Sequence, residues 1–146
     1  FTIYGPYGRP DMLILKMLSL INKSKPLNIY NFGKHLRDFT YINDLVKIIY
    51  KLSKKNNNKI ETFNICASKP VEINKILSLT KKYLRKDILI NYHKKRKGEM
   101  NITYGSNERL IKKINYKKFI SVENGIKKTI KWYNKFSRKE LFETYK

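Results

Sequence analysis

The chain has 146 residues, of which 41% are hydrophobic, and a formal net charge of +22, values that suit one globular domain with a modest core and a basic surface. No apolar run reaches the roughly 18 residues of a membrane-spanning helix, and no basic and apolar leader opens the chain, so we expect neither a membrane protein nor a secreted one. The single cysteine, Cys66, has no partner for an internal disulfide, which favours a cytoplasmic location.

The sequence predicts strands and helices that alternate along the chain. Apolar alternation marks the strands, and apolar residues three and four apart mark the helices. In chain order we expect a strand at 1–4, a helix at about 12–22, a strand at 26–31, a helix at 43–55, a strand at 61–67, a helix at 68–86, a strand at 87–92 and helices at 106–114 and 121–136. This order is typical of an α/β fold, and no repeat or linker divides residues 1–146.

Residue types typical of a helix start stand at the start of each expected helix. They are Pro10 with Asp11, Asn43 or Asp44, Ser68 with Pro70, Ser106, and Ser121. A turn at Gly33 closes the strand at 26–31, and Cys66 is interpreted as a buried position of the strand at 61–67.

The positive charge suggests a nucleic-acid-binding protein as one interpretation. The chain has 27 Lys but only 6 Arg, with 19 Ile, 15 Asn and a single Ala, which is the composition expected from very AT-rich coding DNA. A groove for nucleic acid would favour arginine, whose planar fork suits phosphates and base edges. The lysines are also scattered through every segment. We therefore expect no nucleic-acid partner and keep this function as the weakest alternative.

The chain lacks the common patterns for catalysis on its own. His35 and His93 have no cysteine or carboxylate cluster at metal-ligand spacing, so we expect no metal site. Gly5 and Gly8 have a G-x-x-G spacing, but the third glycine of a dinucleotide fingerprint is absent. The pattern Tyr-x-x-x-Lys occurs at Tyr30/Lys34 and Tyr50/Lys54, about as often as 11 Tyr and 27 Lys in 146 residues produce by chance.

Four motifs give the chain a specific resemblance to a known family. They are FTIYGPYGRPDM (1–12), NIYNFGKHLRDFTYINDLVKII (28–49), FNICASKPVEI (63–73) and RKGEMNIT (96–103) with a later WY (132–133). In order and spacing they resemble the C-terminal half of extended short-chain dehydrogenases/reductases. Among these, the chain is most similar to the NAD-dependent nucleotide-sugar epimerases, and specifically to UDP-glucuronate 4-epimerases.

The resemblance implies an α/β fold in which residues 1–146 form the substrate-binding domain for a UDP-sugar, with the last strands and helices of the Rossmann fold. In such enzymes an N-terminal half carries the glycine-rich NAD loop and the catalytic Tyr and Lys. We expect that half to be absent here, so this chain has no assigned catalytic residue and its cofactor-binding residues are unknown. The implied cofactor is NAD, and the implied full-length enzyme is a homodimer.

The resemblance also assigns residues to the nucleotide. Arg37 and Arg96 match the arginines that bind the pyrophosphate, a group that suits the fork geometry of arginine. Asn28 and Tyr30 lie in the segment that resembles the uracil-binding strand, where they would offer backbone polar groups and an aromatic face. Glu99 stands where the family usually has an aspartate that bonds the ribose hydroxyls.

Two further residues are assigned to the sugar. Thr2 and Arg9 match the positions that hold the sugar carboxylate in glucuronate epimerases. The choice of UDP-glucuronate over other UDP-sugars therefore depends mainly on these two residues. Lys97 replaces a proline that is common in the nearest relatives.

Several of these residues have a structural alternative. Arg37 could cap a helix or pair with Asp38, Arg9 could be a solvent-facing turn residue, and Tyr30 could be ordinary strand packing. Four other residues are interpreted as structural: Thr40, Asp44, Trp132 and Tyr133.

Three functions follow from the sequence. The first is the UDP-sugar-binding half of an epimerase that inverts C4 of UDP-glucuronate with NAD. The second is a non-catalytic nucleotide-sugar-binding relic, or part of a related sugar-nucleotide dehydratase. The third is a basic nucleic-acid-binding protein. Whether the chain alone is an enzyme is left open.

Overall fold

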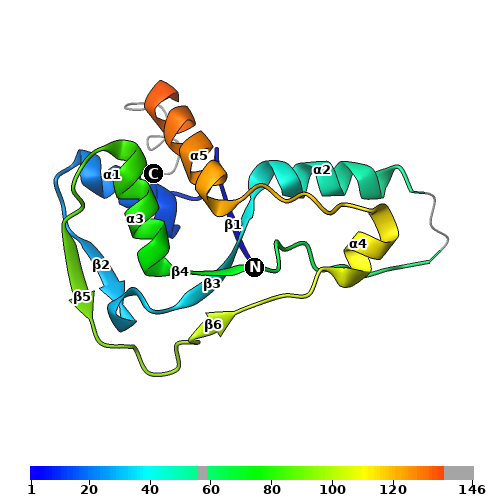
Figure 1. Ribbon diagram of the computed structural model, residues 1–146, viewed down its shortest axis with the longest axis horizontal. Helices are drawn as coiled ribbons and strands as arrows, with labels where there is room; N and C mark the ends of the chain where they lie inside the picture. The colour runs from blue at the N-terminus through cyan, green and yellow to red at the C-terminus, as the bar shows by residue number, and fades with distance from the viewer. Residues whose placement is uncertain (56–58, 137–146) are drawn as a thin grey trace.

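The computed structural model describes residues 1–55 and 59–136 and has the expected α/β architecture (Figure 1). In chain order the elements are β1 (Thr2–Tyr4), α1 (Leu13–Asn22), β2 (Leu27–Tyr30), the 3-10 turn η1 (Asn31–Gly33), β3 (Leu36–Tyr41), α2 (Ile42–Ser53), β4 (Pro70–Glu72), α3 (Ile73–Leu84), β5 (Ile90–His93), β6 (Ile102–Thr103), α4 (Glu108–Ile114) and α5 (Val122–Phe136). Within the described residues, no helix is both long and apolar enough to cross a membrane.

Strand β3 is the centre of the larger sheet. Its C-terminal half pairs in parallel with β1, and its N-terminal half lies between antiparallel β4 and parallel β6. Leu36 is thus opposite both Glu72 and Ile102. Strands β2 and β5 form a separate parallel pair, with Tyr30 opposite His93.

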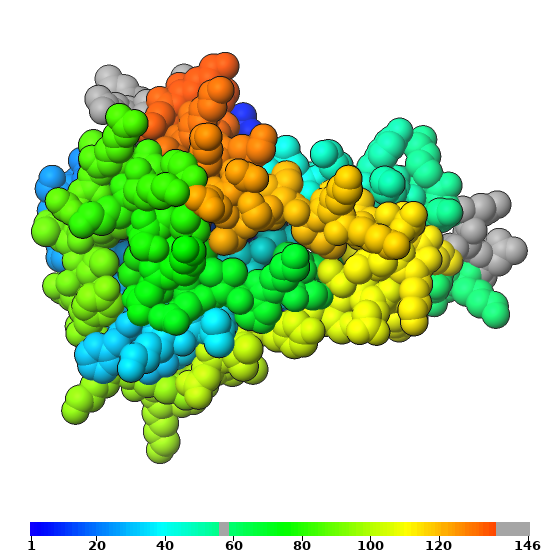
Figure 2. All heavy atoms as spheres, viewed as in Figure 1, coloured from blue at the N-terminus to red at the C-terminus, as the bar shows by residue number. Residues whose placement is uncertain are grey.

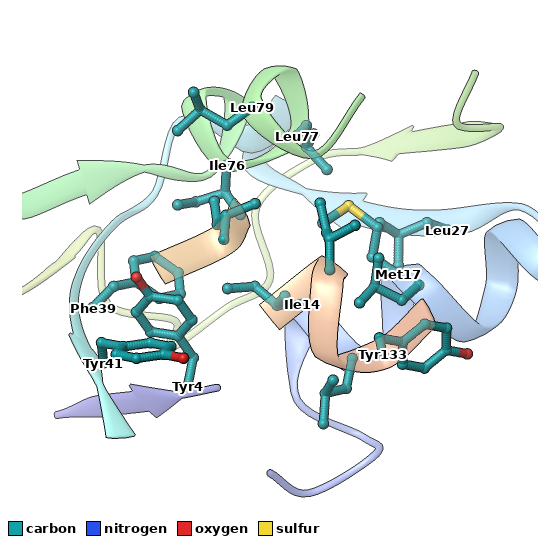
Figure 3. Packing of buried hydrophobic residues seen from close by; sticks show 14 of the residues in the cluster. Tyr4, Ile14, Met17, Leu27, Phe39, Tyr41, Ile76, Leu77, Leu79 and Tyr133 are labelled. Atoms are coloured by element: carbon teal, nitrogen blue, oxygen red, sulfur yellow. The ribbon is translucent and has the colours of Figure 1, made fainter. Parts of the chain in front are cut away.

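The main core lies between the larger sheet and helices α1, α3 and α5 (Figure 3). Tyr4 meets Phe39 and Tyr41 edge to face, with ring centroids 5.8 and 5.6 Å apart. Such pairs contribute about 0.5 to 1.5 kcal/mol each beyond the area they bury. Helix α1 adds the buried side chains Ile14, Leu15, Met17 and Leu18. This packing fixes β1 and β3 against α1, whose start borders the candidate site.

A second apolar cluster lies between α2 and α4. Ile48, Leu110 and Ile114 are its buried members. Asp44, in the first turn of α2, accepts hydrogen bonds from the Tyr116 hydroxyl at 2.6 Å and from the Ile120 amide at 2.8 Å. Burial and this hydrogen bond raise the pKa of Tyr116, so its phenol stays protonated and donates. Asp44 is therefore structural, as expected.

Most expected elements are present, with ends that differ by a few residues. The strands at 1–4, 26–31 and 87–92 are β1, β2 and β5, and four of the helices are α1, α2, α4 and α5. Ser121 caps α5 by accepting a hydrogen bond from the Asn124 amide at 3.3 Å. Pro10 and Asp11 lie in the turn ahead of α1 rather than in its first turn.

The prediction of a strand at 61–67 is wrong. Cys66 is buried as expected, but side chains rather than a neighbouring strand bind the backbone there. Asn107 Nδ2 donates to the Cys66 carbonyl at 2.8 Å, and the Ala67 amide donates to Thr40 Oγ1 at 3.0 Å. An apolar alternation gives an extended chain, but a strand also needs a partner backbone.

The helix expected at 68–86 begins only at Ile73, and residues 70–72 form β4 instead. Pro70 is tolerated there because a short edge strand has an unpaired side. Ser68 is not an N-cap: its φ is 55°, and its amide donates to Asp38 Oδ2 at 3.1 Å. Strands β3 and β6 were not expected from the sequence.

We predict that Asp44→Ala lowers the free energy of unfolding by about 3 kcal/mol, because it leaves the Ile120 amide and the Tyr116 hydroxyl without their acceptor. Urea denaturation of the complete gene product measures this. The matched control is Asp87→Ala: Asp87 pairs with Lys81 at 2.6 Å, but the two side chains are 84% and 63% exposed, so its loss should change stability by about 0.5 kcal/mol or less. Equal losses of unfolding free energy in both variants would contradict the structural role of Asp44.

Candidate functional site

A hollow of about 250 Å³ lies where β1, β2 and β3 meet the chain that precedes β6. Its polar side chains are those of Thr2, Asn28, Tyr30, His35, Arg37 and Glu99. Figure 2 shows the chain around 30–36 against the chain around 93–103 along one edge of the molecule. Five of the seven residues assigned from the sequence therefore share one hollow.

Arg37 lies at the second position of β3. Its Nη1 donates to the Leu36 carbonyl at 2.9 Å and to the Asn101 carbonyl at 3.3 Å. The alternative of an ion pair with Asp38 is not supported, since Asp38 accepts from the Ser68 amide and no ion pair of the described residues includes Arg37. Two carbonyls thus hold the guanidinium beside the hollow without neutralising its charge.

Arg96 and His93 both contact the ring of Tyr30. The Arg96 guanidinium carbon lies 3.5 Å from the ring centroid of Tyr30, and the His93 ring stacks on it at 5.0 Å. His93 Nε2 is also 3.0 Å from Asn28 Oδ1. Arg96 does not line the hollow itself, but its contact with Tyr30 places its guanidinium at the edge of the hollow. The aromatic face of Tyr30 is in contact with a cation, a pairing worth about 0.5 to 2 kcal/mol.

Arg9 does not line the main hollow. It lines a smaller hollow that shares Thr2, Met12 and Leu13 with the main one. Its side chain is 74% exposed and donates from Nε to Asp11 at 3.0 Å. This pair lowers the pKa of Asp11. Arg9 is thus near the site, but it faces solvent in this structure.

His35 is the site residue that the sequence interpretation missed. The residue is only 4% exposed, and its Nδ1 lies 3.8 Å from Glu99 Oε1. Burial lowers the pKa of His35, the Glu99 charge opposes that shift, and Arg37 adds to it. In the structure His35, which directly precedes β3, alternates with Arg37 and Phe39 and shares their face. The sequence did not predict this strand, so it gave no signal for His35.

The electrostatics of the hollow suit a ligand with an anionic part and hydroxyl groups. Arg37 and Arg96 supply fixed positive charge and planar donors. Glu99, with a side chain 30% exposed, supplies a carboxylate acceptor. A larger cavity of about 500 Å³ borders Phe39, β4 and the start of α5, and none of the assigned residues lines it.

Comparison with known proteins shows which family the chain resembles. Residues 1–66 match the NAD dependent epimerase/dehydratase family. The chain is 33% identical to a UDP-glucuronate 4-epimerase of Thermodesulfobacterium geofontis, over 90% of this chain and 41% of that protein. The chain is therefore similar to members of the NAD-dependent epimerase/dehydratase family over most of its own length. It is also 37% identical to an uncharacterised protein of Methanocaldococcus jannaschii, over 91% of this chain and 40% of that one.

The fold agrees with this resemblance. The structure superposes on the UDP-glucuronic acid 4-epimerase of Bacillus cereus, solved with UDP-glucuronic acid and NAD, with a TM-score of 0.84 and 28% identity. The match covers 94% of this chain and 44% of that one. The α/β fold is thus that of an extended short-chain dehydrogenase epimerase, and the chain spans less than half the length of these epimerases.

We predict that the imidazole of His35 titrates below its ordinary pKa of 6.5, because burial disfavours the charged ring. The C2 proton resonance that disappears in His35→Gln identifies His35 in a pH titration by NMR. Glu99→Gln should lower the midpoint further, since the Glu99 charge raises this pKa. A midpoint at or above 6.5, or a rise in Glu99→Gln, would contradict the burial account.

The same shift has a consequence for stability. Because the folded pKa is below the unfolded value, the unfolded state binds the proton more readily. Neutral His35 therefore contributes fully to the free energy of unfolding when the pH is above the pKa of the unfolded state. This contribution decreases as the pH falls toward the pKa of the folded state.

Proposed function

We propose that this chain holds the UDP part of a UDP-sugar in a nucleotide-sugar epimerase, with UDP-glucuronate as the preferred substrate. The observation that supports this most is the gathering of residues assigned to uracil, ribose and pyrophosphate around one hollow. These residues come from β2, β3 and the chain before β6, segments far apart in the sequence. A chance resemblance in short motifs would not bring them together in this way.

The proposed roles follow from the chemistry of each group. Arg37 binds the pyrophosphate with a guanidinium already oriented by two carbonyls. Arg96 lies over Tyr30, and binding the nucleotide would move the guanidinium from the ring toward the pyrophosphate. Asn28 and Tyr30 border the uracil, and Glu99 accepts from the ribose. These contacts supply binding and orientation.

NAD requires a different set of residues. The family that residues 1–66 match is NAD-dependent, but the turn between β1 and α1 does not have the shape of a dinucleotide loop. Gly8 donates from its amide to Gly5 at 3.3 Å, and α1 begins only at Leu13, five positions later. A dinucleotide loop opens its helix at the last glycine. The residues described here do not fit NAD by themselves, so we propose that other residues of the complete protein hold most of it.

The proposed contribution of the chain to C4 epimerisation is to immobilise UDP while the sugar presents one face and then the other. Neither Tyr-x-x-x-Lys pair lies in the hollow: Lys34 and Lys54 are absent from its lining, and Tyr50 is on the exposed side of α2. The groups that transfer the proton and the hydride are therefore proposed to lie outside this chain. A cytoplasmic location and a homodimer stay predictions.

The sugar preference is tested at Arg9 in the complete gene product. An arginine bound to a carboxylate in a closed site makes charge-assisted bonds of about 1.5 to 3 kcal/mol. We predict that Arg9→Ala lowers kcat/KM for UDP-glucuronate about ten- to a hundredfold. UDP-glucose lacks the carboxylate, so its specificity constant should fall much less.

Arg37→Ala is the matched control, because both sugars share the pyrophosphate and both should lose activity alike. The sugar preference is measured as the ratio of the specificity constants for UDP-glucuronate and UDP-glucose in each variant. If Arg9→Ala lowers both constants equally, Arg9 is a turn residue that pairs with Asp11, and the glucuronate preference loses its main support. A complete gene product that binds UDP but converts neither sugar would support the non-catalytic alternative.

A further inference from the structure

Two buried polar atoms of the hollow lack a partner among the described residues: Nε2 of His35 and Oε2 of Glu99. The great majority of buried polar atoms in folded proteins are hydrogen-bonded, so each exception calls for an explanation. Both atoms belong to side chains that line the same hollow, and the other polar atoms of these two groups face each other at 3.8 Å.

The backbone around His35 is held on two sides. The His35 carbonyl accepts from the Ile73 amide at 3.0 Å, at the start of α3, and the next amide, of Leu36, donates to the Asn101 carbonyl at 2.9 Å. The backbone that carries the buried imidazole is therefore fixed beside the sheet. The backbone of Glu99 lies instead in a turn. It follows Gly98, whose φ is 78°, and its amide donates to the Arg96 carbonyl at 3.3 Å.

The protonation state of the pair follows from these surroundings. Burial keeps the pKa of His35 low, so near neutral pH one ring nitrogen donates and the other accepts. A carboxylate only accepts, so the proton belongs on Nδ1, which faces Glu99. The separation of 3.8 Å exceeds a hydrogen bond by roughly 1 Å, and such contacts commonly tighten when a ligand binds.

We propose that His35 is a positioning residue for Glu99. Nδ1–H of His35 holds Oε1 of Glu99, and Oε2 is thereby directed toward a hydroxyl of the ligand in the hollow. This inference rests on the proposed function, in which that hydroxyl belongs to the ribose of a nucleoside diphosphate. A glutamate side chain has one more rotatable bond than an aspartate, and a hydrogen bond from the buried imidazole would restrain it.

The test compares two nucleotides that differ only at the ribose, UDP and 2′,3′-dideoxy-UDP, by calorimetric titration of the complete gene product. The wild-type protein should bind UDP about tenfold or more tightly than the dideoxy analogue. His35→Leu should reduce that ratio severalfold while leaving the affinity for the dideoxy analogue nearly unchanged.

Two conservative variants make the test specific. The amide nitrogen of Asn lies near the place of Nδ1, so His35→Asn should retain most of the UDP preference. The amide of Gln reaches instead toward the place of Nε2, so His35→Gln should behave like His35→Leu. In a Glu99→Ala background, none of the His35 variants should change the ratio further. Thermal unfolding of each variant confirms that it is folded, and the Asn and Gln pair carries the test if His35→Leu does not fold.

The outcomes separate this inference from the proposed function. Failure of the wild-type protein to bind UDP would overturn both. The wild-type protein could instead bind UDP with a clear preference for the ribose hydroxyls. If folded His35→Leu or His35→Gln retained that preference, the result would overturn the role of His35 and leave the proposed function standing. A ratio reduced in His35→Gln and retained in His35→Asn supports it.

Discussion

The buried carboxylate of Asp38 is the interaction on which the arrangement of the site depends. It is fully buried in β3, and its Oδ2 accepts from the Ser68 amide at 3.1 Å and the Gly105 amide at 3.4 Å. Ser68 in turn donates from its hydroxyl to the Gly105 carbonyl at 2.6 Å. One carboxylate therefore joins β3 to the chain before β4 and to the chain between β6 and α4. Bonds to a buried charge are worth about 1.5 to 3 kcal/mol each, so this junction resists displacement.

The alternation of β3 converts this junction into a binding site. Side chains at 38 and 40 face the chain around 67–68, where Asp38 and Thr40 accept backbone hydrogen bonds. Side chains at 35, 37 and 39 face the hollow. The strand is thus anchored by one face and presents ligand-binding groups on the other. Because β4 and β6 flank its first half, the position of Arg37 is fixed by backbone pairing. His35, which directly precedes β3, is held by the hydrogen bond from the Ile73 amide to its carbonyl.

How far the sequence predicted this structure depends on the range of each interaction. Local patterns located the helices and the strands β1, β2 and β5, because apolar spacing and caps such as Ser121 act within a few residues. Strand β3 was not predicted: its pattern is broken by Asp38 and Thr40, polar residues that are buried only because distant amides bind them. Distant contacts also explain the two wrong predictions at 61–67 and Ser68. Local patterns indicated a strand and a helix cap there, but side chains from other parts of the chain determine the structure of these residues.

The assigned site residues came from resemblance, and the structure adds what resemblance could not supply. It shows that Arg96 reaches the site by stacking on Tyr30, and that Arg9 lies beside the hollow in an exposed pair with Asp11. Composition supplied less: the +22 charge remains compatible with an AT-rich gene, and the absence of a nucleic-acid partner stays a prediction.

A crystal structure of the complete gene product with UDP tests the central claim most directly. The account predicts uracil beside Asn28 and Tyr30, ribose hydroxyls at Glu99, and the diphosphate between Arg37 and Arg96, with the Arg96 guanidinium moved from the Tyr30 ring. UDP bound elsewhere, for example in the cavity lined by Lys69, Lys117 and Lys118, or bound in the hollow with the diphosphate away from both arginines, would contradict it.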